Sequence, residues 1–159
     1  MIAGKLADRP HATLDEMQDW ARHLIHSRHP DVIIGENYLR RWHVIPRNTV
    51  GNVYLHQFLR SDDDRALHDH PSNNSSWLIS GCYIEHTHQG KFLRQPGDFV
   101  ERKARQLHRI ELIDNQPCVS LFTTGPKIRD WGFDCPKGWV PWWEFCSPDD
   151  PDQIGKGCG

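Results

Sequence analysis

The first hydrophobic pattern of the chain has the period of an α-helix. Thr13, followed three residues later by Glu16, forms the pair typical of a capping box at a helix start. The apolar positions that follow share one helical face: Leu14, Met17, Ala21, Leu24 and Ile25. Pro30 disfavours helix in the residue before it, so we expect the helix to end near His29. We predict a helical segment within residues 1–37 that packs against the rest of the chain.

The pattern changes from Tyr38 onward to short segments rich in β-branched and aromatic residues. Turn signals such as Gln89-Gly90 and Pro96-Gly97 separate these segments. The expected strands are residues 38–45, 52–60, 75–80, 82–86, 91–94, 98–102, 108–113 and 119–124. Many short strands with almost no helix between them indicate an all-β sandwich or barrel, here over residues 38–124.

The last part of the chain is rich in tryptophan. Four of the seven tryptophans lie close together, at Trp131, Trp139, Trp142 and Trp143. Pro136, Gly138 and Pro141 interrupt regular structure there, so we predict an irregular aromatic flap over residues 125–147 and a frayed tail over 148–159. The aromatic surface must be buried. We expect it on the barrel itself, at the end opposite the pocket mouth, with dimerisation as the alternative.

Length and charge narrow the classes of protein further. A chain of 159 residues suits one domain, and a formal net charge of −2 without a basic cluster argues against nucleic-acid binding. Neither a membrane-spanning run nor a signal peptide is present, which predicts a cytoplasmic protein. The five cysteines include no CxxC pair, so we expect free thiols rather than disulfides.

Three of the eleven histidines have a spacing that suits a metal site. His68 and His70 are two residues apart, which places both imidazoles on one face of a strand. About forty residues later, the turn Pro96-Gly97-Asp98 is followed by a strand and then by His108. Imidazole is the commonest metal ligand in proteins. We therefore predict that these three histidines bind one ion.

These residues resemble the two motifs of the cupin superfamily. His68 and His70, with Gly81 after them, match the first motif, and Gly97 and His108 match the second. The resemblance implies one all-β cupin domain, a double-stranded β-helix or jelly-roll barrel, with a metal in it. Two positions depart from the pattern: Lys103 stands where proline is usual, and Asn74 stands where a glutamate ligand is usual.

Without that carboxylate, the predicted site resembles the three-histidine centres of thiol dioxygenases and β-diketone-cleaving dioxygenases among the cupins. The resemblance implies Fe(II), with Zn(II) or Ni(II) as alternatives, and a small-molecule substrate. Other interpretations stay open. They are a non-catalytic ligand-binding or sensor cupin, a zinc-dependent isomerase or hydrolase, and a cupin that has lost its metal. Cupins commonly dimerise, so a homodimer is an open alternative to a monomer.

Further candidates come from alternation and from charge. On the strand 52–60, Tyr54 and His56 share one face, and this strand often lines the pocket in cupins, so both are candidate acid/base residues. Arg60 and Arg94 are candidates for holding a substrate carboxylate. Asn74 is either a hydrogen-bonding residue of the pocket or a loop residue. Residues 123–145 also resemble a group of bacterial and phage cupins.

Overall fold

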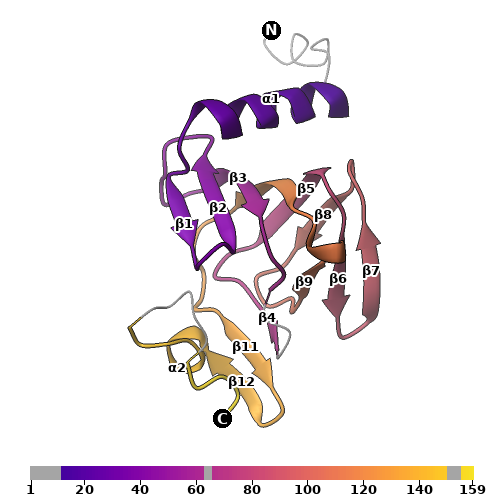
Figure 1. The fold of residues 1–159 in the computed structure, drawn as a ribbon. Coiled ribbons are helices and arrows are strands. Elements are labelled where there is room, and N and C mark those ends of the chain that lie inside the picture. Colours follow the sequence, from indigo (N-terminus) through magenta and orange to yellow (C-terminus); the bar gives the residue numbers. More distant parts are fainter. Residues whose placement is uncertain (1–11, 63–65, 150–154) are drawn as a thin grey trace, which may run out of the picture.

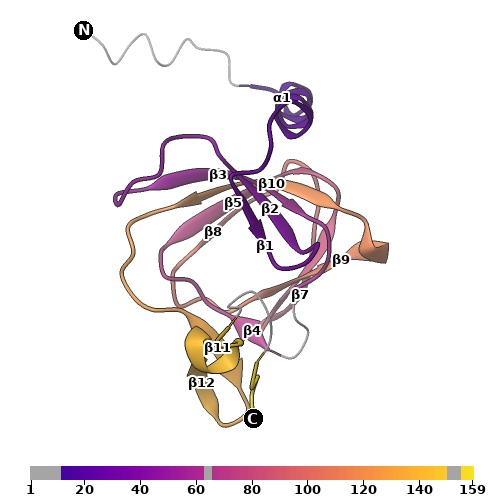
Figure 2. The same cartoon turned by 60° about the vertical axis from the view of Figure 1, so that its left-hand side comes forward.

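The computed structural model describes residues 12–62, 66–149 and 155–159. Helix α1 (Leu14–Ser27) lies across one end of a body of antiparallel strands, and a C-terminal unit of two strands and a short helix lies at the other end (Figure 1). Seen from the side, the strands curl around a shared interior as in a small barrel (Figure 2). The predicted all-β barrel with an N-terminal helix is confirmed.

The described residues form three sheets. The six-stranded sheet has the order β1 (Val32–Ile34), β2 (Leu39–His43), β3 (Asn52–Phe58), β10 (Cys118–Thr124), β5 (Asn74–Ser80), β8 (Phe99–Arg102). A three-stranded sheet has the order β7 (Gly90–Arg94), β6 (Tyr83–Thr87), β9 (Arg109–Leu112). A second three-stranded sheet joins β12 (Gly138–Pro141), β11 (Gly132–Cys135) and β4 (Leu67–His68). Two short helices, η2 (Ile113–Asn115) and α2 (Trp142–Phe145), complete the described elements.

All eight strands expected between residues 38 and 124 are present, and their ends agree with the prediction to within two residues. Strands β1 and β4 were not predicted. They have three and two residues, too few for an alternation of apolar and polar positions to show.

The six-stranded sheet is covered on both faces. Thr13 caps α1 as expected, since its side chain accepts from the Glu16 backbone N–H while the Glu16 side chain accepts from the Thr13 N–H. Ala21 of α1 is buried, and the helix packs with Trp42, Leu55, Ile79 and Val119 of the sheet's outer face. A second cluster joins the inner face to the β6–β9 sheet: Leu39, Phe58, Leu78, Tyr83, Ile110, Leu112 and Cys118. Strand β3 therefore contributes to both clusters: Leu55 packs with the helix, and Phe58 packs with the β6–β9 sheet.

The C-terminal segment is more regular than predicted. Strands β11 and β12 form an antiparallel hairpin in which Cys135 faces Gly138. The expected breaks fall at element ends, because Gly138 takes a positive φ of 120° beside the turn and Pro141 directly precedes α2. Gly132 lies so close to the partner strand that an added Cβ would be 2.2 Å from the Val140 carbonyl oxygen. The segment is a regular hairpin, so the prediction of an irregular flap is wrong.

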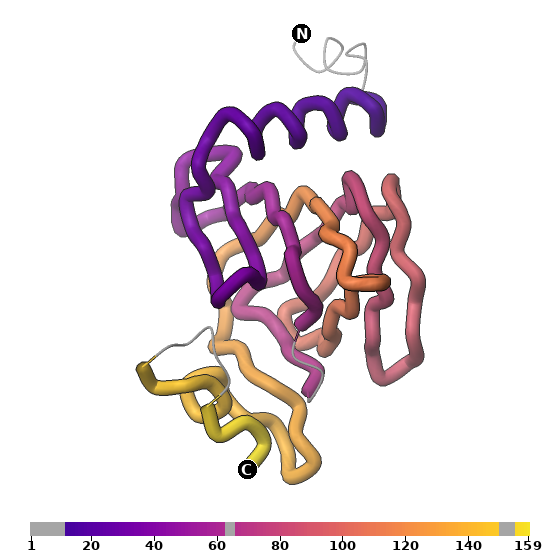
Figure 3. The backbone as a smooth tube through the Cα atoms, viewed as in Figure 1, coloured from indigo at the N-terminus to yellow at the C-terminus, as the bar shows by residue number. Residues whose placement is uncertain are grey.

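The cysteine prediction is wrong for one pair. Cys135 and Cys158 form a disulfide, whereas Cys82 and Cys118 are reduced. The bond holds the chain end against β11, and the Gly155 and Gly157 N–H groups both donate to the Phe145 carbonyl oxygen. Described residues 155–159 are therefore anchored rather than frayed, which Figure 3 shows as a tube returning beside the hairpin. A disulfide is unusual in a reducing cytosol, so it does not support the cytoplasmic prediction.

Among the helices in the described ranges, none has the length and apolar character required to cross a bilayer.

Cys158→Ser tests how far the disulfide stabilises the fold. The bond closes a loop of 23 residues, so its loss is expected to lower the free energy of unfolding by about 3 kcal/mol through loop entropy. Urea unfolding without reductant measures the difference, with Cys82→Ser as the control. In excess reductant, wild type and Cys158→Ser should unfold together. Equal stability without reductant would show that the bond is not formed in solution.

Candidate metal centre

The three predicted ligand histidines lie together at one side of the barrel interior. His68 and His108 form an isolated antiparallel bridge in which each backbone N–H donates to the other's carbonyl oxygen at 2.9 Å. The His70 N–H donates to the Ala104 carbonyl oxygen at 2.9 Å. Their ring centroids are 4.9 to 5.2 Å apart, and one nitrogen from each ring lies within 4.8 Å of the others. The structure thus brings together the residues that the spacing selects.

The trio also has the chemistry of a metal site. His70 Nδ1 and His108 Nε2 are buried and have no hydrogen-bond partner among the described residues. Burial, with a smaller effect of neighbouring His108, lowers the pKa of His68 to about 4. Burial also lowers the pKa of His70 well below its ordinary value, and His68 and His108 add to that effect. Neutral imidazoles with unused lone pairs are what a divalent transition ion requires, so the residues fit a metal.

A buried carboxylate stands directly behind His108. Glu85 on β6 is 2% exposed, and its Oε1 lies 2.8 Å from His108 Nδ1. Arg102 Nε donates to the same oxygen at 2.7 Å, and Arg94 Nε donates to Oε2 at 2.8 Å. Burial alone would raise the pKa of Glu85, but the His108 hydrogen bond and the Arg102 charge outweigh it and hold the pKa well below its ordinary value. Glu85 is therefore ionised.

A second buried carboxylate lies beside His68. Asp62 Oδ2 is 3.8 Å from His68 Nδ1 and accepts from the Ile110 N–H at 2.7 Å. The Tyr38 hydroxyl donates to the other oxygen, Oδ1. Sequence reasoning missed both Asp62 and Glu85. For Glu85 a signal existed, since it shares the inner face of β6 with Tyr83, where a charged side chain needs a specific partner.

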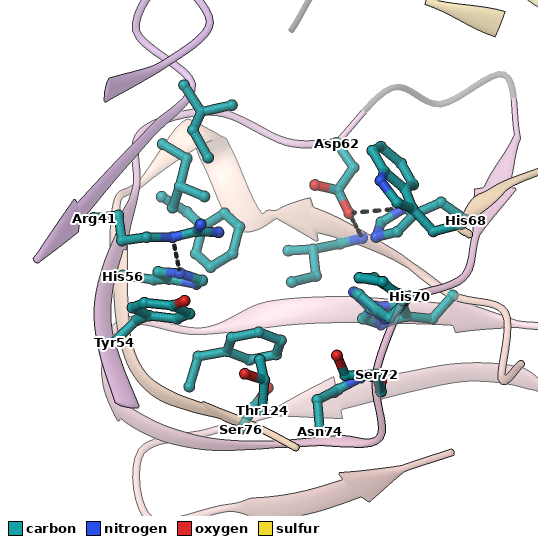
Figure 4. Close-up of a pocket in the computed structure, with 18 of the residues that line it drawn as sticks. Arg41, Tyr54, His56, Asp62, His68, His70, Ser72, Asn74, Ser76 and Thr124 are labelled. Atoms are coloured by element: carbon teal, nitrogen blue, oxygen red, sulfur yellow. Dashed lines mark hydrogen bonds and ion pairs between the residues drawn. The ribbon is translucent and has the colours of Figure 1, made fainter. Parts of the chain in front are cut away.

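The trio opens on a cavity of about 1690 Å³. Tyr54, His56 and Arg41 line the wall opposite His68 and His70 (Figure 4). His56 stacks between Tyr54 and Phe122, at centroid distances of 5.8 and 5.0 Å, and Arg41 Nε donates to His56 Nε2 at 2.9 Å. Burial, and then the Arg41 charge, lower the pKa of His56 well below its ordinary value. The predicted inward face of this strand is present, and its histidine is neutral.

The three candidate substrate residues occupy different places. Asn74 lines the cavity and is buried, with Nδ2 donating to the Ser72 carbonyl oxygen at 3.2 Å. Arg60 also lines it, with its guanidinium 5.7 Å from the Tyr38 ring centre. Arg94 is not among the lining residues, because its guanidinium is held by Glu85. Arg94 therefore pairs with Glu85, the carboxylate that contacts His108.

The C-terminal hairpin of β11 and β12, with Trp131 and Trp142 at its ends, forms part of the cavity wall. Phe133 pairs with His68 in the β11–β4 ladder, and Trp131 and Trp142 line the cavity. Asp69, the residue between the two motif histidines, accepts from the Gly132 N–H at 2.8 Å and from Trp139 Nε1 at 3.0 Å. The segment packs on the barrel itself, as expected, through strand β4, which is too short to be recognised from the sequence as an edge for pairing.

Comparison with solved structures identifies the fold. A cupin-2 domain from Rhodospirillum rubrum superposes with a TM-score of 0.57 at 10% identity, covering 68% of this chain and 77% of its own. A cupin-like protein from Thermotoga maritima gives 0.51 at 12% identity, covering 62% and 78%. A DMSP lyase, DddQ from Ruegeria pomeroyi, gives 0.51 at 15% identity, covering 64% of this chain and 54% of its own.

The chain therefore has the cupin fold, as its motifs suggest. No protein-family model and no curated protein sequence matches it.

The depressed pKa values predict how metal affinity depends on pH. An ordinary histidine takes up a proton below pH 6.5 and then cannot bind metal, whereas His68 does so only near pH 4. Proton competition at His68 and His70 is therefore expected to weaken Co(II) binding only below about pH 5. Competition with a chromophoric chelator measures it, with circular dichroism confirming that the protein remains folded. A loss near pH 6.5 whose slope corresponds to more than one proton would contradict the lowered pKa values of His68 and His70.

Proposed function

We propose that this chain is a metal-dependent cupin enzyme that binds one divalent transition ion through His68, His70 and His108 and acts on a small molecule in the adjoining cavity. The observation that carries the proposal is the convergence of three imidazoles, two of them with buried and unpartnered nitrogens, on one cavity wall. Imidazoles buried this way without a ligand would lose hydrogen bonds that water supplies in the unfolded chain.

We propose Fe(II) as the ion and a dioxygenase reaction as the chemistry. Three neutral ligands leave the ion's double positive charge to be balanced by an anionic substrate, and they leave coordination positions open toward the cavity. Bound iron would supply a binding site for O₂ and the electrons to activate it. The likeness of the ligand set to three-histidine dioxygenases among the cupins supports this choice over Zn(II) and Ni(II).

The chain's own residues would orient the substrate between two unlike walls. Arg41, Tyr54 and His56 form a polar wall, and Trp131 and Trp142 form an aromatic one. A molecule with a charged or hydroxylated end and an apolar part complements both. His56 is a candidate acid/base residue: because its Nε2 accepts from Arg41, the proton that it can share with a substrate is the one on Nδ1. Tyr54 beside it is the second candidate for this role. Arg60 can attract an anionic group to the cavity.

A zinc-dependent isomerase, hydrolase or lyase is the second candidate. It is favoured by the neutral histidine on the wall opposite the trio, because acid/base chemistry requires such a group facing the ion. The cupin-fold neighbour from Ruegeria pomeroyi is a lyase, which supports a non-oxidative reaction on this fold. A non-catalytic ligand-binding or sensor protein is the third.

Metal content tests the site. Purified wild-type protein is expected to carry close to one divalent transition ion per chain, and His68→Ala/His70→Ala is expected to carry almost none, because one imidazole cannot retain the ion. Elemental analysis of both proteins measures this. His88→Ala is the control, since His88 is exposed, pairs with Asp134 and does not line the cavity. Full metal in the double variant would reject the assignment.

Oxygen consumption separates the candidate reactions. Protein reconstituted with Fe(II) is expected to consume O₂ in the presence of a turned-over substrate from a panel of small thiols, diketones and carboxylates, while Zn(II) protein should not. His56→Gln is expected to lower turnover while metal content stays unchanged. Product formation by Zn(II) protein without O₂ would favour the second candidate, and tight binding without turnover would favour the third.

A further inference from the structure

The buried carboxylate Glu85 contacts the predicted ligand His108 but is not itself one of the predicted metal ligands. Glu85 lies in the interior between strands, and three cationic or polar side chains surround it. Arg102 contacts Oε1 through Nε at 2.7 Å and Nη2 at 2.5 Å, and Arg94 contacts Oε2 through Nε at 2.8 Å and Nη2 at 2.7 Å. His108 Nδ1 completes the set at 2.8 Å from Oε1.

We propose that Glu85 is a positioning residue of the metal centre, which fixes His108 in the tautomer with its proton on Nδ1 and so leaves Nε2 bare toward His68 and His70. An ionised carboxylate only accepts hydrogen bonds, so the contact requires Nδ1 to be the donor. The nitrogen left over is His108 Nε2, which is buried and has no hydrogen-bond partner among the described residues. The role toward the ion rests on the proposed function, whereas the tautomer does not.

The two arginines explain why the carboxylate stays in this state. Both Oε atoms are held by guanidinium groups from separate strands, Arg94 on β7 and Arg102 on β8. Two Arg charges against one Glu charge leave the cluster at +1, so protonation of the carboxyl would leave two unpaired cations in the interior. Arg102 Nη1 also donates to Ser76 Oγ at 3.0 Å, and Ser76 lines the cavity. Hydrogen bonds thus hold the cluster both at the Glu85 carboxylate and at the cavity wall.

This arrangement accounts for a ligand set without its usual carboxylate. Asn74 occupies the position at which the cupin motif usually places glutamate, so no negative ligand is predicted at the ion. A carboxylate bonded to the far nitrogen of a ligand histidine makes that imidazole a stronger donor. Glu85 supplies negative charge to the centre through His108 instead of by direct contact.

Glu85→Gln tests the proposal with two readouts that do not depend on activity. Long-range ¹H–¹⁵N spectra of the metal-free protein are expected to show His108 protonated on Nδ1 in wild type and shifted toward a mixture of tautomers in the variant. Affinity for Co(II), measured by chelator competition, is expected to fall by about ten- to a hundredfold. Glu111→Gln is the matched control. It removes the carboxylate of another carboxylate–histidine pair, Glu111–His86, and should change neither the His108 signals nor the affinity.

A second pair of variants covers the case in which Glu85→Gln does not fold. The double variant Glu85→Gln/Arg94→Gln keeps the cluster at +1 and places a second amide, not a cation, beside the amide introduced at position 85. The tautomer shift and affinity loss are expected to persist there, while Arg94→Gln alone, which keeps the carboxylate, should show neither.

The proposal would be overturned by wild-type His108 carrying its proton on Nε2, or by a folded Glu85 variant with unchanged His108 signals and affinity within about twofold of wild type. Wild-type protein that binds no metal but shows the expected tautomer would reject the proposed function alone.

Discussion

The backbone bridge between His68 and His108 connects the C-terminal hairpin to the β6–β9 sheet through strand β4. Strand β4 has only two residues, yet one of its edges pairs with β11 and the other meets His108 at the start of β9. Two hydrogen bonds of 2.9 Å therefore connect the C-terminal hairpin to the β6–β9 sheet. Because the bridged residues are themselves predicted ligands, the same bonds set the separation of the two imidazoles. Any change that shifts this register by a residue would move both the cavity wall and the predicted metal ligands.

Buried carboxylates hold the elements around the cavity in a consistent way. Glu85 accepts from His108. Asp62 lies beside His68 and accepts from the Tyr38 hydroxyl and from the backbone of β9. Asp69 accepts from the backbone of the hairpin at β11. Each has hydrogen-bond or ion-pair partners, which is the condition for a charge to be tolerated in a protein interior. Removing one partner from such a group costs more than the contact itself contributes, because the other charge stays buried. The polar interior therefore favours a single arrangement of the ligands.

Sequence reasoning succeeded where a periodic pattern was long enough to detect. The strands between residues 38 and 124 that have four to seven residues and a helix with a capping box were recognised, and the HxH spacing with His108 selected three histidines that the structure brings together. It failed where structure depends on partners distant in the chain. The pairing of Phe133 with His68 and of Cys135 with Cys158 leaves no local signal, and Arg94 looks like a cavity residue until Glu85 is seen opposite it. Long-range pairing is decided by packing rather than by local preference.

The late position of the C-terminal hairpin has a consequence for how the protein is made. All three predicted ligands have been synthesised by residue 108, but the strand that pairs with β4 begins at Gly132 and the cysteine that ties the segment down is Cys158. A nascent chain therefore presents the three histidines while one wall of their cavity is still missing. The Trp131 and Trp142 side of the cavity is thus completed only after the three histidines and strand β10 have been made.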